Sequence, residues 1–313
     1  MRIFDKPNFN FIRWRWQALA LSGVIILAGL ATIVARGGLP LGVDFTGGTV
    51  VLVDFEQSPT EDAVRDALGS QASDAIVQRF GATGASQFMI RLPLRDEAES
   101  LDAASKAVEE ALRAGGLGQF EVISRELVSP TIGSDLRGKA IWATVTALAG
   151  ILAYIGFRFR ISFAVGAVVA TFHDIVMTLV FLTWFGYDLS LNVVAAILTI
   201  AGYSVNDTIV IFDRVRENQR AARREGLESV VNRAVNETLG RTVITAGTTL
   251  LAVIALYLFG GEVLEGFAFT MMVGIVMGTY STVFIASSVA IILSGRTAQT
   301  PAGAADNQRR ARA

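Results

Sequence analysis

Residues 201–218, AGYSVNDTIVIFDRVREN, follow a long apolar run, yet they place the amide of Asn206 and the carboxylate of Asp207 before the apolar residues end. On a helix, this spacing puts Tyr203 on the same face as both polar residues. At about 1.5 Å per residue, Asp207 lies roughly 9 Å from the end of the run near Asp213. Because a carboxylate facing lipid costs about 2.5–3.5 kcal/mol, this face is predicted to point into a helix bundle or a wet cavity.

The composition of the chain favours a membrane protein. Of 313 residues, 52% are hydrophobic and only 18% are charged, whereas a soluble domain carries about 25% charged residues. Runs long enough to cross a bilayer, about 20 residues, lie at 16–35, 139–157, 161–185, 189–212, 242–260 and 266–293. The first run is longer than the apolar core of a signal peptide and lacks a clear cleavage site, so it is predicted to be an uncleaved helix at 16–36. The predicted fold class is therefore a multi-pass α-helical membrane protein with six spans.

The distribution of Lys and Arg predicts the orientation of the spans. The N-terminal residues, the turn after the second span, the connection after the fourth span and the C-terminal residues are basic, whereas 186–188 and 261–265 contain no Lys or Arg. Because cytoplasmic loops carry the excess of basic residues, both termini are predicted to be cytoplasmic. The predicted domains are a cytoplasmic N-terminus at 1–15, a periplasmic domain at 37–138, a helix bundle at 139–293 with a basic cytoplasmic loop at 213–240, and a disordered cytoplasmic tail at 294–313.

Between the first two spans, the chain has the composition and pattern of a soluble α+β domain. Strands are predicted at 48–56, 75–81, 86–93 and 119–127, with the middle two joined by a turn at 82–85. Helices are predicted from Ser58 to about Leu68 and through 97–114. The order β-α-β-β-α-β is that of a ferredoxin-like domain. Residues 40–135 contain 16 acidic and 7 basic residues, a net charge of −9, which fits either a solvated face or a surface that contacts a partner or an emerging polypeptide.

Two further sets of polar residues interrupt the predicted spans. Arg241 opens the fifth span, where it either reaches the interface by snorkelling or joins a polar network around Asp207, because a buried carboxylate requires a cation or a proton. His173 and Asp174 lie near the middle of the third span, either as a hydrogen-bonded packing contact or as a second ionisable site.

Small residues mark the last span at four-residue spacing, which is typical of close helix packing. The ladder indicates either a contact between the fourth and sixth spans or a contact with a partner protein. It consists of Gly266, Thr270, Gly274, Gly278 and Thr282. The chain has no Cys and one His, so neither a thiolate nor a His-rich metal site is expected. No nucleophile has a His neighbour, and no cofactor, enzymatic activity or nucleic-acid binding is predicted.

Four motifs together resemble the SecF group of the SecD/SecF protein-export family. They are GVDFTGGT at 42–49, HD at 173–174, GYSVNDTIVIFDRVREN at 202–218 and NETLGRTVITAGTTLL at 236–251. The resemblance extends from about residue 9 to 293. It implies half of an RND-type transporter plan, in which six helices carry an outside domain between the first and second helices. It also implies a role in late steps of preprotein translocation across the bacterial inner membrane, driven by the proton-motive force.

The resemblance assigns expected roles to individual residues. Asp207 and Arg241 match family positions implicated in proton flow, and we add Asp174, His173, Asn206 and Tyr203 as candidates for proton coupling. The signature formed by Gly42, Asp44, Phe45, Gly47 and Gly48 is expected to bend the backbone between membrane and domain. Gly274 and Gly278 are the helix-packing candidates.

The partners that the resemblance implies are SecD, the SecYEG channel, YajC, the YidC insertase, the translocating preprotein and membrane lipid. Two other functions remain open at the level of sequence. One is a structural subunit without proton coupling of its own, and the other is half of an RND-type transporter for small molecules or lipids.

Overall fold

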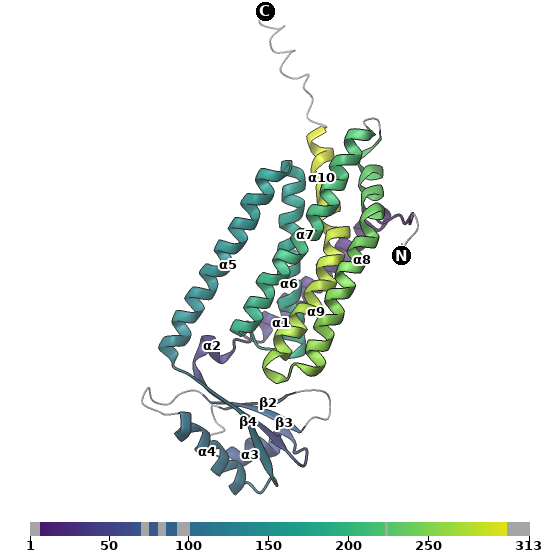
Figure 1. Ribbon diagram of the computed structural model, residues 1–313. Helices are drawn as coiled ribbons and strands as arrows, with labels where there is room; N and C mark the ends of the chain where they lie inside the picture. Colours follow the sequence, from purple (N-terminus) through teal and green to yellow (C-terminus); the bar gives the residue numbers. More distant parts are fainter. Residues whose placement is uncertain (1–6, 70–74, 81–85, 93–100, 223–224, 299–313) are drawn as a thin grey trace, which may run out of the picture. The chain divides into compact units, whose positions relative to one another are not determined.

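The computed structural model describes residues 7–69, 75–80, 86–92, 101–222 and 225–298 (Figure 1). The chain divides into two compact units. A helical unit comprises residues 1–39, 144–187 and 192–313, and an α+β unit comprises residues 40–143 and 188–191. Helices α5 and α7 run continuously from one unit into the other, because their residues fall on both sides of these boundaries.

Six helices are long and apolar enough to cross a membrane, which confirms the predicted fold class. A short 3-10 turn, Ile12–Trp14, leads into the first of them. The bounds are α1 Arg15–Ala35, α5 Pro130–Arg158, α6 Ile161–Phe185, α7 Leu191–Ala221, α8 Leu227–Phe259 and α9 Glu262–Ser281, the last continuing through a π-helical segment, Thr282–Ala286, into α10 Ser287–Ala298.

The centre of the helical unit is formed by α6, α7 and α9. About half or more of their apolar windows is buried, 56%, 50% and 61%, against 17% for α1, 6% for α5 and 11% for α8. Small side chains allow this close approach, as shown by the fully buried Ala196, Ala201, Ala268 and Ala286. The outer helices α1, α5 and α8 therefore present large apolar faces to whatever surrounds the chain.

The helices extend beyond the apolar runs in three places, which corrects the sequence-based boundaries. The predicted loop 213–240 is mostly helix, since α7 continues to Ala221 and α8 begins at Leu227. The helix of the second span also begins at Pro130, before the predicted boundary at 138. Charged residues do not end a helix when apolar residues keep helical spacing, and Val215, Val230 and Ala234 are all buried in one cluster here.

The predicted disordered tail lies mostly outside the described residues. Up to Ala298 the chain remains helical, so the start predicted at Ser294 is too early.

The α+β unit is a four-stranded antiparallel sheet with two helices, in the element order predicted from sequence (Figure 1). The strands are β1 Gly48–Phe55, β2 Ile76–Phe80, β3 Gln87–Leu92 and β4 Phe120–Val128, and the helices are α3 Glu61–Leu68 and α4 Leu101–Ala114. The sheet order is β2-β3-β1-β4, and every neighbouring pair is antiparallel. This is the ferredoxin-like arrangement; the predicted turn at 82–85 lies outside the described residues.

The core of this unit lies between the sheet and its helices. Val51, Val53 and Phe55 alternate along β1 and pack with Val64 and Leu68 of α3. The period of two in the strand and of about four in the helix places both sets on the facing surfaces. Helix α3 ends at Leu68 as predicted but begins at Glu61, three residues after the predicted start at Ser58, because the Thr60 hydroxyl caps it by accepting a hydrogen bond from the Ala63 N–H at 3.2 Å.

Candidate functional site: buried polar groups in the helical unit

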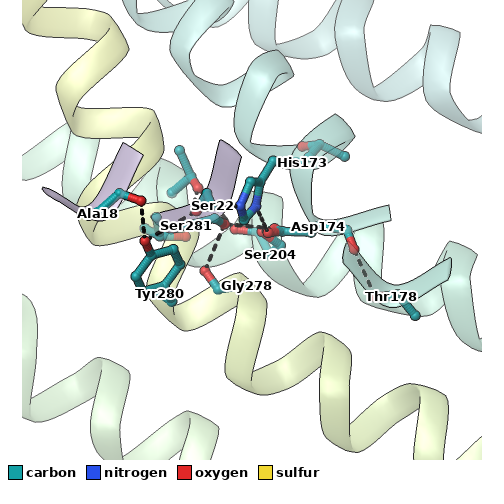
Figure 2. Close-up of polar contacts among 12 residues, drawn as sticks. Ala18, Ser22, His173, Asp174, Thr178, Ser204, Gly278, Tyr280 and Ser281 are labelled. Atoms are coloured by element: carbon teal, nitrogen blue, oxygen red, sulfur yellow. Dashed lines mark hydrogen bonds and ion pairs between the residues drawn. The ribbon is translucent and has the colours of Figure 1, made fainter. Parts of the chain in front are cut away.

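Asp174 of α6 is the most enclosed carboxylate in the helical unit, with no exposed surface. Three side chains donate to it (Figure 2). Ser204 of α7 donates to Oδ2 at 2.5 Å, Ser281 of α9 donates to the same oxygen at 2.7 Å, and His173 Nδ1 lies 3.0 Å from Oδ1. Because buried carboxylates are stable only when their oxygens are paired, this set of donors explains how α6 tolerates Asp174.

His173 connects this cluster to α1. Its Nε2 lies 3.0 Å from the Ser22 hydroxyl, and Ser22 lies 3.2 Å from the hydroxyl of Tyr280, which donates to the carbonyl of Ala18 at 2.7 Å. An ionised Asp174 can only accept hydrogen bonds. His173 therefore carries a hydrogen on Nδ1, which points at the carboxylate, while the Ser22 hydroxyl beside Nε2 donates its own hydrogen to Tyr280.

The cluster therefore joins four helices, α1, α6, α7 and α9, through side chains that are buried or nearly so. Directly after Ser281, the chain changes from α-helix to π-helix at Thr282–Ala286. Thr282 pairs with Thr208 of α7 at 3.0 Å, and the Ser287 hydroxyl donates to the carbonyl of Thr282 at 3.1 Å. π-Helical segments commonly mark functional sites, and this one begins with Thr282, which contacts α7, directly after the donor Ser281.

Asp207 has different surroundings. Its Oδ1 accepts a hydrogen bond from Thr242 of α8 at 3.0 Å, so α7 and α8 are joined at this level. Among the described residues, Asp207 and Arg241 form no ion pair within 4.0 Å, and the side chain of Arg241 is exposed. The sequence placed the partner of Asp207 on the right helix, but the residue that contacts the carboxylate is Thr242.

The other two polar residues of the opening motif, Asn206 and Tyr203, lie at the edge of this site. Asn206 is exposed, and Asp207 is only partly buried. The hydroxyl of Tyr203 is buried and has no hydrogen-bond partner among the described residues. The polar face of α7 is thus closed by neighbours at Ser204 and Thr208 and left open at Asn206.

The glycine ladder of α9 lies against α7. A Cβ added to Gly274 would meet the side chain of Ile200 at 2.2 Å, and one added to Gly278 would meet the Cβ of Ser204 at 3.1 Å. The same absence of side chains brings Ser281 within reach of Asp174. The structure therefore shows the first of the two predicted contacts for the ladder, the one between the fourth and sixth spans.

In the α+β unit, the signature at 42–48 forms a short helix, α2 Val43–Thr46, that ends at two glycines with positive φ, Gly47 at 71° and Gly48 at 131°. These backbone angles are strained for any residue with a Cβ. Phe45 is buried. The predicted bend in the backbone is therefore a turn from α2 directly into strand β1.

The signature also holds the segment 188–191. The N–H of Gly42 donates to the carbonyl of Leu189 at 2.8 Å, and a Cβ on Gly42 would approach that carbonyl oxygen to 3.0 Å. The carboxylate of Asp44 accepts a hydrogen bond from the N–H of Leu191, the first residue of α7, at 2.8 Å.

Sequence reasoning missed a partly buried ion pair beside this contact. Arg91 of β3 pairs with Asp188 and also donates to the carbonyl of Leu41 at 3.3 Å. Burial raises the pKa of Asp188, and Arg91 opposes that rise. An acidic residue in a connection of three residues between two spans was a signal, but nothing in the sequence identifies Arg91 as its partner. Within the described residues, no group of three or more His, Asp or Glu side chains could hold a metal ion.

Six apolar helices, carboxylates enclosed among them and a ferredoxin-like unit inserted after the first helix define a multi-pass membrane protein with buried ionisable groups. Comparison with known proteins identifies its family. The family described as protein export membrane protein SecD/SecF, C-terminal, matches residues 107–296, and the SecD/SecF GG motif matches residues 33–59.

Curated relatives agree with this match. The protein translocase subunit SecF of Desulfurispirillum indicum is 42% identical over 282 residues, which cover 88% of this chain and 89% of the relative. The SecF of Escherichia coli O157:H7 is 37% identical over 289 residues, which cover 92% of this chain and 88% of the relative. The chain belongs to the SecD/SecF protein-export family and is similar to its SecF translocase subunits.

Solved structures show the same fold. The crystal structure of SecDF, a translocon-associated membrane protein from Thermus thermophilus, is 33% identical with a TM-score of 0.82 over 92% of this chain. The match covers 39% of the SecDF chain, so this chain spans about two fifths of that protein.

Proposed function

We propose that this chain is the SecF-type half of a proton-driven protein-export complex in a bacterial inner membrane. Its termini lie in the cytoplasm, residues 37–138 lie in the periplasm, and SecD supplies the other half. The complex acts on preproteins at late steps of their passage through the SecYEG channel. YajC and the YidC insertase are further partners to be tested.

The observation that carries this proposal is the open polar face around Asp207. Asp207 has a hydroxyl donor from Thr242, while Asn206 and Arg241 are exposed and the Tyr203 hydroxyl is buried without a partner among the described residues. Polar side chains that face lipid are costly. A second helical half that covers this face would remove that cost, and the solved SecDF relative is a chain long enough to contain one.

Proton binding at Asp207 supplies a physical means of switching. Protonation removes a negative charge from a partly buried site and changes its attraction to Arg241, so two helix arrangements are favoured in turn. One elementary charge moving through 100 mV is worth about 2.3 kcal/mol. That is enough to shift a two-state equilibrium by tens of fold, at about 1.4 kcal/mol per tenfold change.

The contacts of α7 offer a route for such a change to reach the α+β unit. Helix α7 carries Asp207, and its first residue, Leu191, is held by Asp44 of the signature. A movement of α7 along or about its axis therefore acts on the turn from α2 into β1.

Asp174 has a different role in this proposal. Its carboxylate has no exposed surface and is hydrogen bonded to three helices besides its own through Ser204, Ser281 and the link from His173 to Ser22. We assign it to fixing α7 against α6 and α9, whereas Asp207 exchanges the proton.

The test is export of a preprotein into inverted membrane vesicles, with and without a proton gradient, after motor ATP has been exhausted. Asp207→Asn is expected to lose the gradient-dependent part of export while still co-purifying with SecD. Asp213→Asn is the matched control, because it makes the same chemical change on the same helix at a residue paired with Arg158. It is expected to retain gradient-dependent export.

Normal gradient-dependent export by Asp207→Asn defeats the proposal. A structural subunit gives a different pattern, in which Asp207→Asn lowers the amount of assembled complex and export falls only in proportion. A small-molecule or lipid transporter predicts full export in both variants, with loss of substrate flux in Asp207→Asn.

A further inference from the structure

A cleft of about 710 Å³ lies at one end of the helical unit, between the turn joining α5 to α6 and the segment joining α7 to α8. Four arginines line it, Arg158 and Arg160 from the turn and Arg216 and Arg220 from α7. Its volume is within the range of small-molecule sites, about 300–1,000 Å³. Nothing in the proposed proton pathway uses these residues.

The charge in this cleft is not balanced by its acidic neighbours. Each nearby carboxylate already has an arginine partner. Arg158 of the cleft pairs with Asp213 at 2.7 Å, which leaves three of the four arginines. The other two pairs are Glu217 with Arg214 at 2.7 Å and Glu225 with Arg233 at 2.9 Å. In the part of the chain that the structure describes, Arg160, Arg216 and Arg220 form no ion pair, and all three are exposed. Three positive charges therefore remain for a ligand.

Large apolar residues lie beside the arginines. Phe157, in the last turn of α5, is 94% exposed, and Ile161, the first residue of α6, is 82% exposed. Both belong to helices that are apolar enough to span a membrane. A small soluble anion would leave these apolar side chains exposed, whereas the acyl chains of a lipid would cover them.

We infer that this cleft binds the headgroup of an anionic phospholipid. Its phosphate is held by Arg160, Arg216 and Arg220, and its acyl chains run along Phe157 and Ile161. Guanidinium groups pair with phosphate through two parallel hydrogen bonds, and basic pockets between membrane helices bind anionic headgroups. The lipid holds the α5–α6 turn against the C-terminal end of α7.

The proposal is tested on the full-length protein in detergent by native mass spectrometry, with phosphatidylglycerol or phosphatidylcholine added to the micelles. Wild type is expected to bind phosphatidylglycerol and not phosphatidylcholine. Each arginine near an anionic headgroup contributes about fivefold in affinity, so Arg160→Gln/Arg216→Gln/Arg220→Gln is expected to bind on the order of a hundredfold more weakly. The corresponding triple Lys variant keeps the charges and is expected to stay within tenfold of wild type.

The matched control is Arg65→Gln/Arg113→Gln/Arg125→Gln, which removes the same net charge from the α+β unit and is expected to bind phosphatidylglycerol as wild type does. Equal binding by the triple Gln variant of the cleft and wild type overturns the inference. So does equal weakening in the control, or displacement of the lipid by inorganic phosphate alone at millimolar concentration. The Gln variants change exposed side chains, and the three single variants serve if the triple variant does not fold.

Discussion

The carboxylate of Asp44 accepts a hydrogen bond from the N–H of Leu191 at 2.8 Å, although the two residues are 147 positions apart. The first N–H groups of a helix have no partner within the helix. Asp44 thus acts as an N-terminal cap for α7, supplied by the signature segment. The signature has two functions in one short segment, since its glycines turn the chain and its carboxylate fixes the start of the helix that carries Asp207.

Asp44→Ala is expected to weaken the start of α7 by about 1 kcal/mol, the usual effect of losing a cap. Asp44→Asn keeps an acceptor oxygen and should lose less than half of that. Hydrogen–deuterium exchange at the amides of 191–194 measures the effect directly. Asp62→Ala is the control, since Asp62 is an exposed residue of α3, and exchange at 191–194 should not change. Unaltered protection in Asp44→Ala would show that the contact carries no energy.

The Arg91–Asp188 pair predicts a pH-dependent stability. The exposed fractions of the two side chains are 13% and 14%, so Arg91→Met leaves a largely covered carboxylate without its cation and is expected to cost about 3 kcal/mol at neutral pH, the lower end of the range for buried pairs. Burial already raises the pKa of Asp188, and Arg91 is the group that lowers it. In the variant, the folded state therefore binds the proton of Asp188 more tightly than the unfolded state does.

The sign of the effect follows from this difference. The contribution of Asp188 to the stability of the variant is greatest at low pH and falls as pH rises from the ordinary value for Asp, 3.8, through the raised value. Thermal denaturation between pH 4 and pH 8 should show the deficit of Arg91→Met growing with pH. Adding Asp188→Asn should remove this slope and restore part of the stability. A deficit that is constant over the whole range contradicts the assignment.

Much of the fold could be predicted from sequence because its signals are local. Apolar runs of bilayer length and strands with alternating residues are read from neighbouring positions, and they predict the six spans and the β-α-β-β-α-β order. The ends of α7 and α8 could not be predicted in this way. Beyond Asp213 the sequence becomes charged, and the continuation of the helix depends on the packing of Val215 against the other buried residues of its cluster.

From the sequence, the presence of polar residues within the spans could be predicted, but their contacts could not. An Asp within an apolar run signals a polar face, and both Asp174 and Asp207 were found by that rule. Which of them is enclosed depends on Ser204 and Ser281, whose helices meet Asp174 only in the folded bundle. The sequence pointed to Arg241 as the partner of Asp207, but the folded bundle places Thr242 there. One position along α8 changes the direction in which a side chain points.

Close packing at Gly274 predicts a coupled pair of substitutions. Gly274→Ala places a methyl group 2.2 Å from side-chain atoms of Ile200, and overpacking of this kind costs about 1–3 kcal/mol. Ile200→Ala alone leaves a cavity, but in the double variant each change relieves the other. The loss of thermal stability in the double variant should therefore be smaller than the sum of the losses in the two single variants. Gly202→Ala is the control because no atom lies within 4 Å of its added Cβ, and additive losses in the double variant would rule out the contact.

Asp174 is the residue at which charge and hydrogen bonding can be separated. In Asp174→Asn, the amide oxygen can accept from Ser204 and Ser281, and its NH₂ group can donate to Nδ1 of His173. The ring then carries its hydrogen on Nε2 and donates to Ser22, whose hydroxyl is free to donate to Tyr280 at 3.2 Å. We expect a loss of about 1 kcal/mol, against about 3 kcal/mol for Asp174→Leu, which leaves the donors unpaired.

Because the chain has a single His, ¹⁵N NMR of the imidazole reports the tautomer without assignment. Wild type should carry a hydrogen on Nδ1, whereas Asp174→Asn should carry one on Nε2 and none on Nδ1. Asp174→Asn should also keep gradient-dependent export, in contrast to Asp207→Asn, because a fixing role requires hydrogen bonds and not a titrating group. Loss of gradient-dependent export with intact assembly would instead place Asp174 in the path of the proton, and an unchanged tautomer would show that the ring does not adapt to the amide.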